Sequence, residues 1–235
     1  LLQNLGSGVR IYEYESAANP DMTGMPVRAL TADVHQSGPT RVIPFDLSKD
    51  IGTEYPATSP NLLSAFIRVK ANESIETEAT ATSQAFYVIR GAGTSHSEFG
   101  AMAWTEGDLF VVPGAKKLIK HCAEEDTAIY WVSDEPLLKY LGVAPVEKKF
   151  KPTLFRKERL LAEMEAIRHE PGAEHKNRMG ILLGNAATEK TTKTLTQTLW
   201  SLLNVLPAND KQRPHRHNSV ALDLCVYAPP EGAYT

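Results

Sequence analysis

Four short apolar segments recur at regular intervals in the middle of the chain, and their spacing limits the folds that are possible. Each segment is rich in β-branched and aromatic residues, and turn-forming residues separate it from the next one. The segments are Leu63–Val69, Ala85–Gly91, Gly107–Pro113 and Thr127–Val132. Because no helical pattern alternates with them, they favour an antiparallel sandwich or barrel over a parallel α/β sheet.

The residues on the N-terminal side of this region have a different composition. Two strand-like pieces, Val9–Tyr14 and Thr40–Phe45, lie among Gly, Pro, Asn and Asp residues. We expect residues 1–55 to form an extended N-terminal arm and residues 56–150 to form a first barrel.

A single amphipathic helix is predicted between Phe155 and Arg168. Its apolar residues recur at helical spacing, and Glu170-Pro171-Gly172 ends the pattern. These residues are Leu160, Leu161, Met164 and Ile167. One apolar stripe is typical of a helix that packs on the wall of a barrel. We therefore assign residues 151–190 to a linker that contains this helix.

Residues 191–235 contain a candidate metal site. Strand character returns in Thr191–Trp200, and an apolar segment, Leu199–Leu206, then leads to His215 and His217. In a strand, residues two apart point to the same side, so both imidazoles would enter one cavity. Imidazole nitrogens bind divalent transition metals, and a catalytic site adds a further protein ligand. The pair therefore predicts a metal site, and a purely structural pair of histidines is the alternative.

Asp223 is the acidic residue closest to this pair on its C-terminal side. It lies six residues after His217, and this even offset lets its carboxylate face the same cavity if no bulge intervenes. Asp223 could be a metal ligand, could orient one of the histidines, or could pair with Arg213.

Charge and cysteine content limit the partners. The formal net charge of -3 and the pI near 6.2 leave no basic footprint for nucleic acid or an anionic membrane. No apolar run reaches the roughly 18 residues that a membrane span needs. A small-molecule partner is therefore expected. Cys122 and Cys225 are too few for a disulfide framework, and the first residues lack a signal sequence, so we expect a reducing cytoplasm.

Three segments of the first barrel resemble the motifs of the cupins, a superfamily of jelly-roll barrels. They are Phe86–Gly93, Glu106–Gly114 and Trp131–Leu138. Within the superfamily the chain looks most like the bicupins related to gentisate 1,2-dioxygenase. The run from Leu199 to Leu222, which contains Pro214-His215-Arg216-His217, is similar to the metal-binding half of those enzymes. The resemblance implies an all-β bicupin with a linker helix.

The comparison of the two barrels indicates that the first has lost its metal. Glu78 and Thr80 stand at the positions that match the two histidines, and Leu118 ends the segment where a third cupin histidine is usual. His121 lies three residues beyond Leu118, and we expect this odd offset to turn it away from the barrel interior. The first barrel would then be structural and pack against the second.

We expect the second barrel, in residues 191–235, to be incomplete. A jelly roll has about eight strands, and the residues after His217 leave room for one or two. We expect the chain to be a fragment, with the third metal ligand beyond Thr235; a neighbouring chain that supplies the missing strands is the alternative.

The resemblance implies a ring-cleaving dioxygenase that uses Fe(II), or another divalent metal, to open a small hydroxylated aromatic with dioxygen. His215 and His217 would be metal ligands, and Asp223 and Arg213 would be catalytic residues that orient the ligands or the substrate. The position of Asp223 is typically basic in the gentisate-type enzymes, and an acid there would repel a carboxylate on the substrate.

Two other classes of function stay open. One is a non-catalytic cupin that binds or regulates, and the other is a metal-dependent isomerase or lyase on the same scaffold. Exposed barrel edges and the N-terminal arm favour a homo-oligomer in each case.

Overall fold

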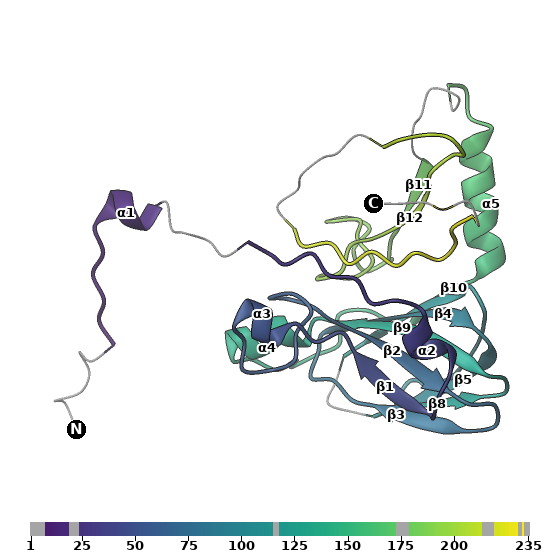
Figure 1. The fold of residues 1–235 in the computed structure, drawn as a ribbon, viewed down its shortest axis with the longest axis horizontal. Coiled ribbons are helices and arrows are strands. Elements are labelled where there is room, and N and C mark those ends of the chain that lie inside the picture. The colour runs from purple at the N-terminus through teal and green to yellow at the C-terminus, as the bar shows by residue number, and fades with distance from the viewer. Residues whose placement is uncertain are drawn as a thin grey trace.

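The computed structural model describes residues 8–18, 24–114, 118–172, 179–212, 219–229 and 232. Within them most of the regular secondary structure is β-strand (Figure 1). The strands are β1 Arg41–Pro44, β2 Leu63–Val69, β3 Ser74–Thr77, β4 Ser83–Arg90, β5 Ala92–Ser97, β6 Gly100–Thr105, β7 Leu109–Pro113, β8 Ile119–Ala123, β9 Thr127–Ser133, β10 Thr153–Phe155, β11 Met179–Leu183 and β12 Ser201–Val205. The helices are α1 Tyr14–Ala18, α2 Asp33–Gln36, α3 Ser48–Ile51, α4 Glu135–Leu141 and α5 Lys157–Arg168.

Two antiparallel sheets form the jelly-roll barrel that the sequence predicts. The larger has six strands in the order β1-β2-β9-β4-β7-β10, and the smaller has four in the order β3-β8-β5-β6. The four predicted segments are β2, β4, β7 and β9, which are neighbours in the larger sheet. The prediction of an all-β fold with an antiparallel barrel is therefore confirmed.

The main core lies between the two sheets. Residues of alternate strand positions point inward, as the twofold repeat of a strand requires. Phe86 is fully buried and stacks on Phe110, with ring centroids 4.8 Å apart, and on Trp131, with centroids 6.0 Å apart. Ile67 and Trp104 belong to the same buried cluster. Side chains thus fill the barrel interior.

A second core lies on the outer face of the six-stranded sheet. Leu109 and Val111 of β7 project from this face toward Leu160 of α5 and Leu183 of β11. Figure 1 shows α5 and the β11–β12 ribbon on the same side of the barrel. The predicted helix over Phe155–Arg168 is therefore present, and it packs on the barrel wall as expected.

The N-terminal region differs from its prediction in two places. Residues 9–13 have no regular structure and Tyr14 begins α1, so Val9–Tyr14 is not a strand in this chain. Figure 1 shows α1 away from the barrel. By contrast, β1 lies within the range assigned to the arm, yet it pairs with β2, with Ile43 opposite Phe66. The larger sheet therefore begins at Arg41, well before residue 55.

The residues after α5 form a two-stranded ribbon. Ile181 of β11 pairs with Leu203 of β12, and both join the outer core. The strand expected in Thr191–Trp200 is wrong: these residues form turns and bends, and β12 begins at Ser201. Among the described residues from 191 onward, β12 is the one strand, so a second barrel stays a prediction. No helix in the described part of the chain is long and apolar enough to cross a membrane.

Candidate functional site

The predicted metal pair lies outside the residues that the structure describes. Arg213, His215 and His217 all fall in the range 213–218, so their role as catalytic and metal-binding residues stays a prediction. Asp223 is described, and it lies in the irregular segment 219–229.

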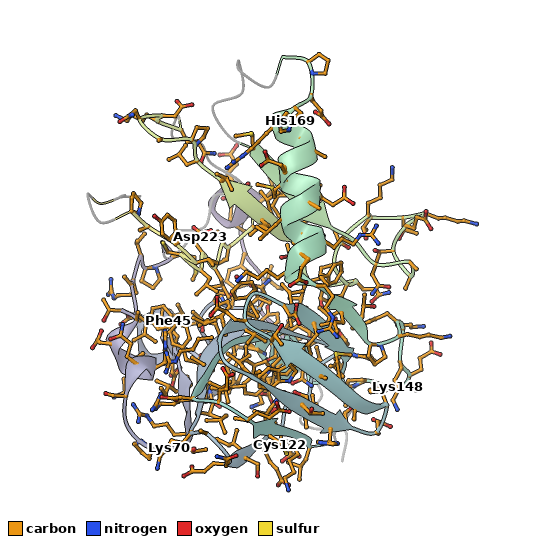
Figure 2. All side chains as sticks on the ribbon, turned by 90° about the vertical axis from the view of Figure 1, so that its right-hand side faces the viewer. Phe45, Lys70, Cys122, Lys148, His169 and Asp223 are labelled. Atoms are coloured by element: carbon orange, nitrogen blue, oxygen red, sulfur yellow. The ribbon has the colours of Figure 1, made fainter. Side chains whose placement is uncertain are left out.

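Asp223 lies over the outer face of the six-stranded sheet. Burial raises the pKa of Tyr130 to about 12, and the nearby Asp223 carboxylate adds to this rise, while a hydrogen bond with Ser64 opposes it. Tyr130 belongs to β9 of the barrel. Figure 2 shows Asp223 between the barrel and the ribbon that follows α5. The segment after the histidine pair thus returns to the wall of the first barrel.

His121 points into the first barrel, so the prediction that it faces outward is wrong. It is fully buried on β8, where Ile119 and Ala123 are buried beside it. Leu118 is itself half exposed, with 51% of its surface accessible. An odd offset from an outward residue leads inward, which is the physical reason for the error.

Both ring nitrogens of His121 are engaged by hydroxyl groups. Nε2 lies 3.0 Å from Thr77 Oγ1, and Nδ1 lies 2.7 Å from Ser95 Oγ. The indole N–H of Trp104 donates to the same Ser95 oxygen at 2.8 Å. Burial lowers the pKa of His121 to about 3. The ring is therefore neutral at pH 7, and each of its nitrogens already has a partner within the core.

The positions that match the predicted metal ligands do not converge on His121. Glu78 is exposed, and the backbone N–H of Thr80 donates to Glu135 Oε1 at 3.2 Å. Among the described residues, no group of three or more His, Cys, Asp or Glu side chains could hold a metal ion. The expected loss of metal from the first barrel stays a prediction, and the hydroxyl partners of His121 support it.

A small cavity opens beside this polar cluster. Ser95, Phe110 and Ile119 contribute to its lining, and its volume is about 30 Å³. A water molecule needs roughly 10–15 Å³ measured in this way, whereas pockets for small organic ligands are roughly 300–1,000 Å³. This cavity can hold water, but it is too small for an aromatic substrate.

Asp108, which belongs to the Gly-Asp motif of the barrel, joins the barrel to helix α5. Its side chain is fully buried, and its two oxygens accept hydrogen bonds from Arg156 Nη1 at 2.8 Å and from the backbone N–H of Lys157 at 3.0 Å. Lys157 is the first residue of α5. A carboxylate at this position satisfies a free helical N–H and complements the helix dipole. Asp108 lies in the motif segment Glu106–Gly114, and nothing in that segment predicts its contact with α5.

No family model matches the chain. A curated protein is similar to part of the chain. The 5-aminosalicylate 1,2-dioxygenase of a Comamonas species is 29% identical over 86 residues, which are 37% of this chain and 23% of that protein. Over this stretch the chain is similar to a ring-cleaving dioxygenase. This supports the family suspected from the sequence motifs, and the chain spans 23% of the length of the curated relative that it matches.

Solved structures that resemble part of the chain include two kinds of protein. Salicylate 1,2-dioxygenase from Pseudoaminobacter salicylatoxidans, in adducts with gentisate, is 22% identical, with a TM-score of 0.38, over 51% of this chain and 29% of that one. A cupin superfamily protein from Desulfitobacterium hafniense is 15% identical, with a TM-score of 0.34, over 46% of this chain and 93% of that one.

Proposed function

We propose that this chain belongs to a metal-dependent dioxygenase that opens the ring of a small hydroxylated aromatic compound. The observation that carries the proposal is the match to a 5-aminosalicylate 1,2-dioxygenase, in a chain that also contains the Pro214-His215-Arg216-His217 motif. The barrel fold of residues 41–155 agrees with this class.

The donor set in the sequence fits Fe(II). Two neutral imidazoles at His215 and His217 are suited to iron and to other divalent transition metals. When bound, the ion supplies adjacent open positions for the hydroxyl groups of the substrate and for dioxygen. In the proposal, Asp223 and Arg213 orient the histidines or the substrate.

The location of Asp223 bears on the choice of substrate. Its carboxylate would repel a carboxylate on the substrate and would accept a hydrogen bond from an amino or a hydroxyl group. A panel of gentisate, salicylate and 5-aminosalicylate tests this preference, because these compounds share the aromatic carboxylate and differ at one ring position. We propose the amino compound as the best of the three.

The test is to measure iron content and oxygen uptake on intact protein purified without oxygen. We expect near-stoichiometric iron and oxygen uptake with at least one compound of the panel. Both should be lost in His215→Ala and His217→Ala, and both should persist in His96→Ala, which removes an exposed histidine of β5. Absence of iron and of oxygen uptake in the wild type would refute the proposal.

The same measurements separate the two alternatives. Stoichiometric metal with no oxygen uptake would favour an isomerase or a lyase, and absence of metal would favour a binding or regulatory cupin.

A cytoplasmic location and a homo-oligomer also belong to the proposal. The free thiols of Cys122 and Cys225 support a reducing compartment.

A further inference from the structure

Asp134 carries a carboxylate that is fully buried at the end of strand β9. Its Oδ1 accepts hydrogen bonds from the backbone N–H groups of Thr82, at 2.8 Å, and Ser83, at 3.1 Å. A buried charge is tolerated when hydrogen bonds replace the lost water. These two bonds hold Thr82 and the first residue of β4 against the end of β9.

The second oxygen of Asp134 reaches out of the barrel. Oδ2 accepts hydrogen bonds from the hydroxyl of Thr82 and from the hydroxyl of Thr198, the latter at 2.8 Å. Thr198 Oγ1 also lies 3.1 Å from Ser83 Oγ. Thr198 is 64 residues further along the chain than Asp134. One carboxylate therefore ties the barrel to the segment that leads into β12.

The segment around Thr198 is a well-defined turn. The backbone N–H of Leu199 donates to Thr196 Oγ1 at 3.0 Å, and the N–H of Thr196 donates to the Leu199 carbonyl at 3.1 Å. Leu195 and Leu199 are buried in the outer core. Strand β12 begins at Ser201, three residues after Thr198. A constraint on the Thr198 hydroxyl is thus transmitted to the start of β12.

The β11–β12 ribbon needs such a constraint. Two-stranded ribbons are marginally stable by themselves, and Leu182 and Trp200 are more than half exposed. The apolar contacts of Ile181 and Leu203 hold the ribbon to the barrel, but such contacts are not directional. A hydrogen bond to a fixed carboxylate is directional and stronger than one between neutral groups.

We propose that Asp134, acting through Thr198, is a positioning residue that fixes β12 on the first barrel. His215 and His217 follow β12 in the sequence, so we expect a loss of this contact to weaken metal binding as well. This last step rests on the proposed function, whereas the anchoring of β12 does not.

Amide hydrogen exchange of the intact protein tests the anchor. Thr198→Val removes the hydroxyl, and we expect the β12 amides to exchange roughly 10- to 100-fold faster, as the loss of a hydrogen bond to a charged group predicts. Amides of β2 and β9 should keep their wild-type rates. Thr198→Ser, which keeps a hydroxyl, should restore slow exchange.

Thr82→Val is the matched control, because it removes the other hydroxyl from the same Asp134 oxygen within the barrel. It should leave β12 at the wild-type rate. Unchanged exchange of β12 in Thr198→Val, or equally fast exchange of β12 in Thr82→Val, would overturn the proposal.

Iron affinity tests the positioning step. In competition with a chelator, Thr198→Val should bind Fe(II) at least several-fold more weakly than the wild type, and Thr198→Ser should match the wild type. Faster exchange of β12 with unchanged iron affinity would overturn the positioning role. A wild type that binds no iron would refute the proposed function, and the exchange rates would still decide the anchor.

Discussion

The two faces of the six-stranded sheet bury similar side chains, but they are covered in different ways. On the inner face, Phe86 packs in a core that the second sheet of the same barrel closes. On the outer face, Tyr87 lies in a core that α5 and the β11–β12 ribbon complete. These later segments are tied to the barrel by two buried carboxylates, Asp108 and Asp134.

The inner core is therefore complete within the barrel, whereas the outer core depends on α5 and the β11–β12 ribbon. The inner core is closed by strand pairing throughout both sheets, so its stability is spread over many contacts. The outer core depends on segments that arrive from later in the chain, and a few polar contacts set their position. Changes to the inner face should therefore unfold the barrel, whereas loss of the Thr198 hydroxyl or of the Asp108 charge should mainly loosen what covers the outer face.

The largest effect is expected for Phe86→Ala. The ring is fully buried between Phe110 and Trp131, so its removal leaves a cavity and should lower the free energy of unfolding by about 3–5 kcal/mol. Tyr87→Ala, one residue along on the outer face, should cost clearly less because Tyr87 remains partly exposed. Urea denaturation measures the free energy of unfolding of both variants, and equal losses would contradict the distinction between the two faces.

The next effect is a pH dependence that comes from His121. Its pKa is about 3 in the folded barrel and near 6.5 when unfolded. The unfolded chain therefore binds the proton more readily, so stability is full above pH 6.5 and falls as the pH drops toward 3. Between pH 7.5 and pH 5 this amounts to about 2 kcal/mol. Urea midpoints measured across this range provide the test.

His121→Gln isolates this contribution from that of other groups. The amide can still bond to the hydroxyls of Thr77 and Ser95, but it does not titrate. We expect the variant to lose most of the extra slope between pH 6.5 and pH 5. His35, whose pKa burial and then Arg90 lower, should give the remaining slope. An identical pH dependence in wild type and variant would contradict a buried neutral His121.

A smaller effect is expected for Asp108→Asn. The amide accepts fewer strong hydrogen bonds and leaves Arg156 without its carboxylate, but the half-exposed Arg156 limits the loss. We expect a cost of about 1 kcal/mol, seen as faster hydrogen exchange in α5 while β2 and β9 keep their rates. A uniform loss over the whole barrel would contradict the dependence proposed for the outer face.

The smallest effect is expected for Glu106→Gln, which is the matched control for Asp108. Glu106 pairs with Lys157 at 3.1 Å, and both side chains are substantially exposed. Pairs of this kind contribute about 0–1 kcal/mol because water and salt screen them. Thermal unfolding should give this variant a free energy of unfolding within about 0.5 kcal/mol of the wild type. A loss as large as that of Asp108→Asn would contradict the expected screening of the Glu106–Lys157 pair.

The sequence predicted one sheet better than the other. Strands β2, β4, β7 and β9 are buried on both faces along much of their length, so they appear as apolar runs. Strands β6 and β8 have one solvent-facing side, where Ala103 of β6 and Lys120 of β8 are exposed. The alternation of apolar and polar residues in these two strands is short and weak, so no local pattern separated them from loops.

The candidate site was predicted to a lesser extent. The motif around His215 and His217 is visible in the sequence because it is short and local. The inward direction of His121 was missed because it was counted from Leu118, which precedes β8 and is itself half exposed. No local sequence pattern groups Thr77, Ser95 and His121, because the three residues come from β3, β5 and β8.

By itself the sequence determined the β-rich barrel and helix α5, because each follows from local periodicity, and the metal pair stays a prediction from a short motif. Only the tertiary structure decided which way His121 points and what Asp134 binds. The physical reason is separation along the chain: Asp134 and Thr198 are 64 residues apart, and they meet because the outer face of the sheet must be covered. No pattern within either segment encodes that encounter.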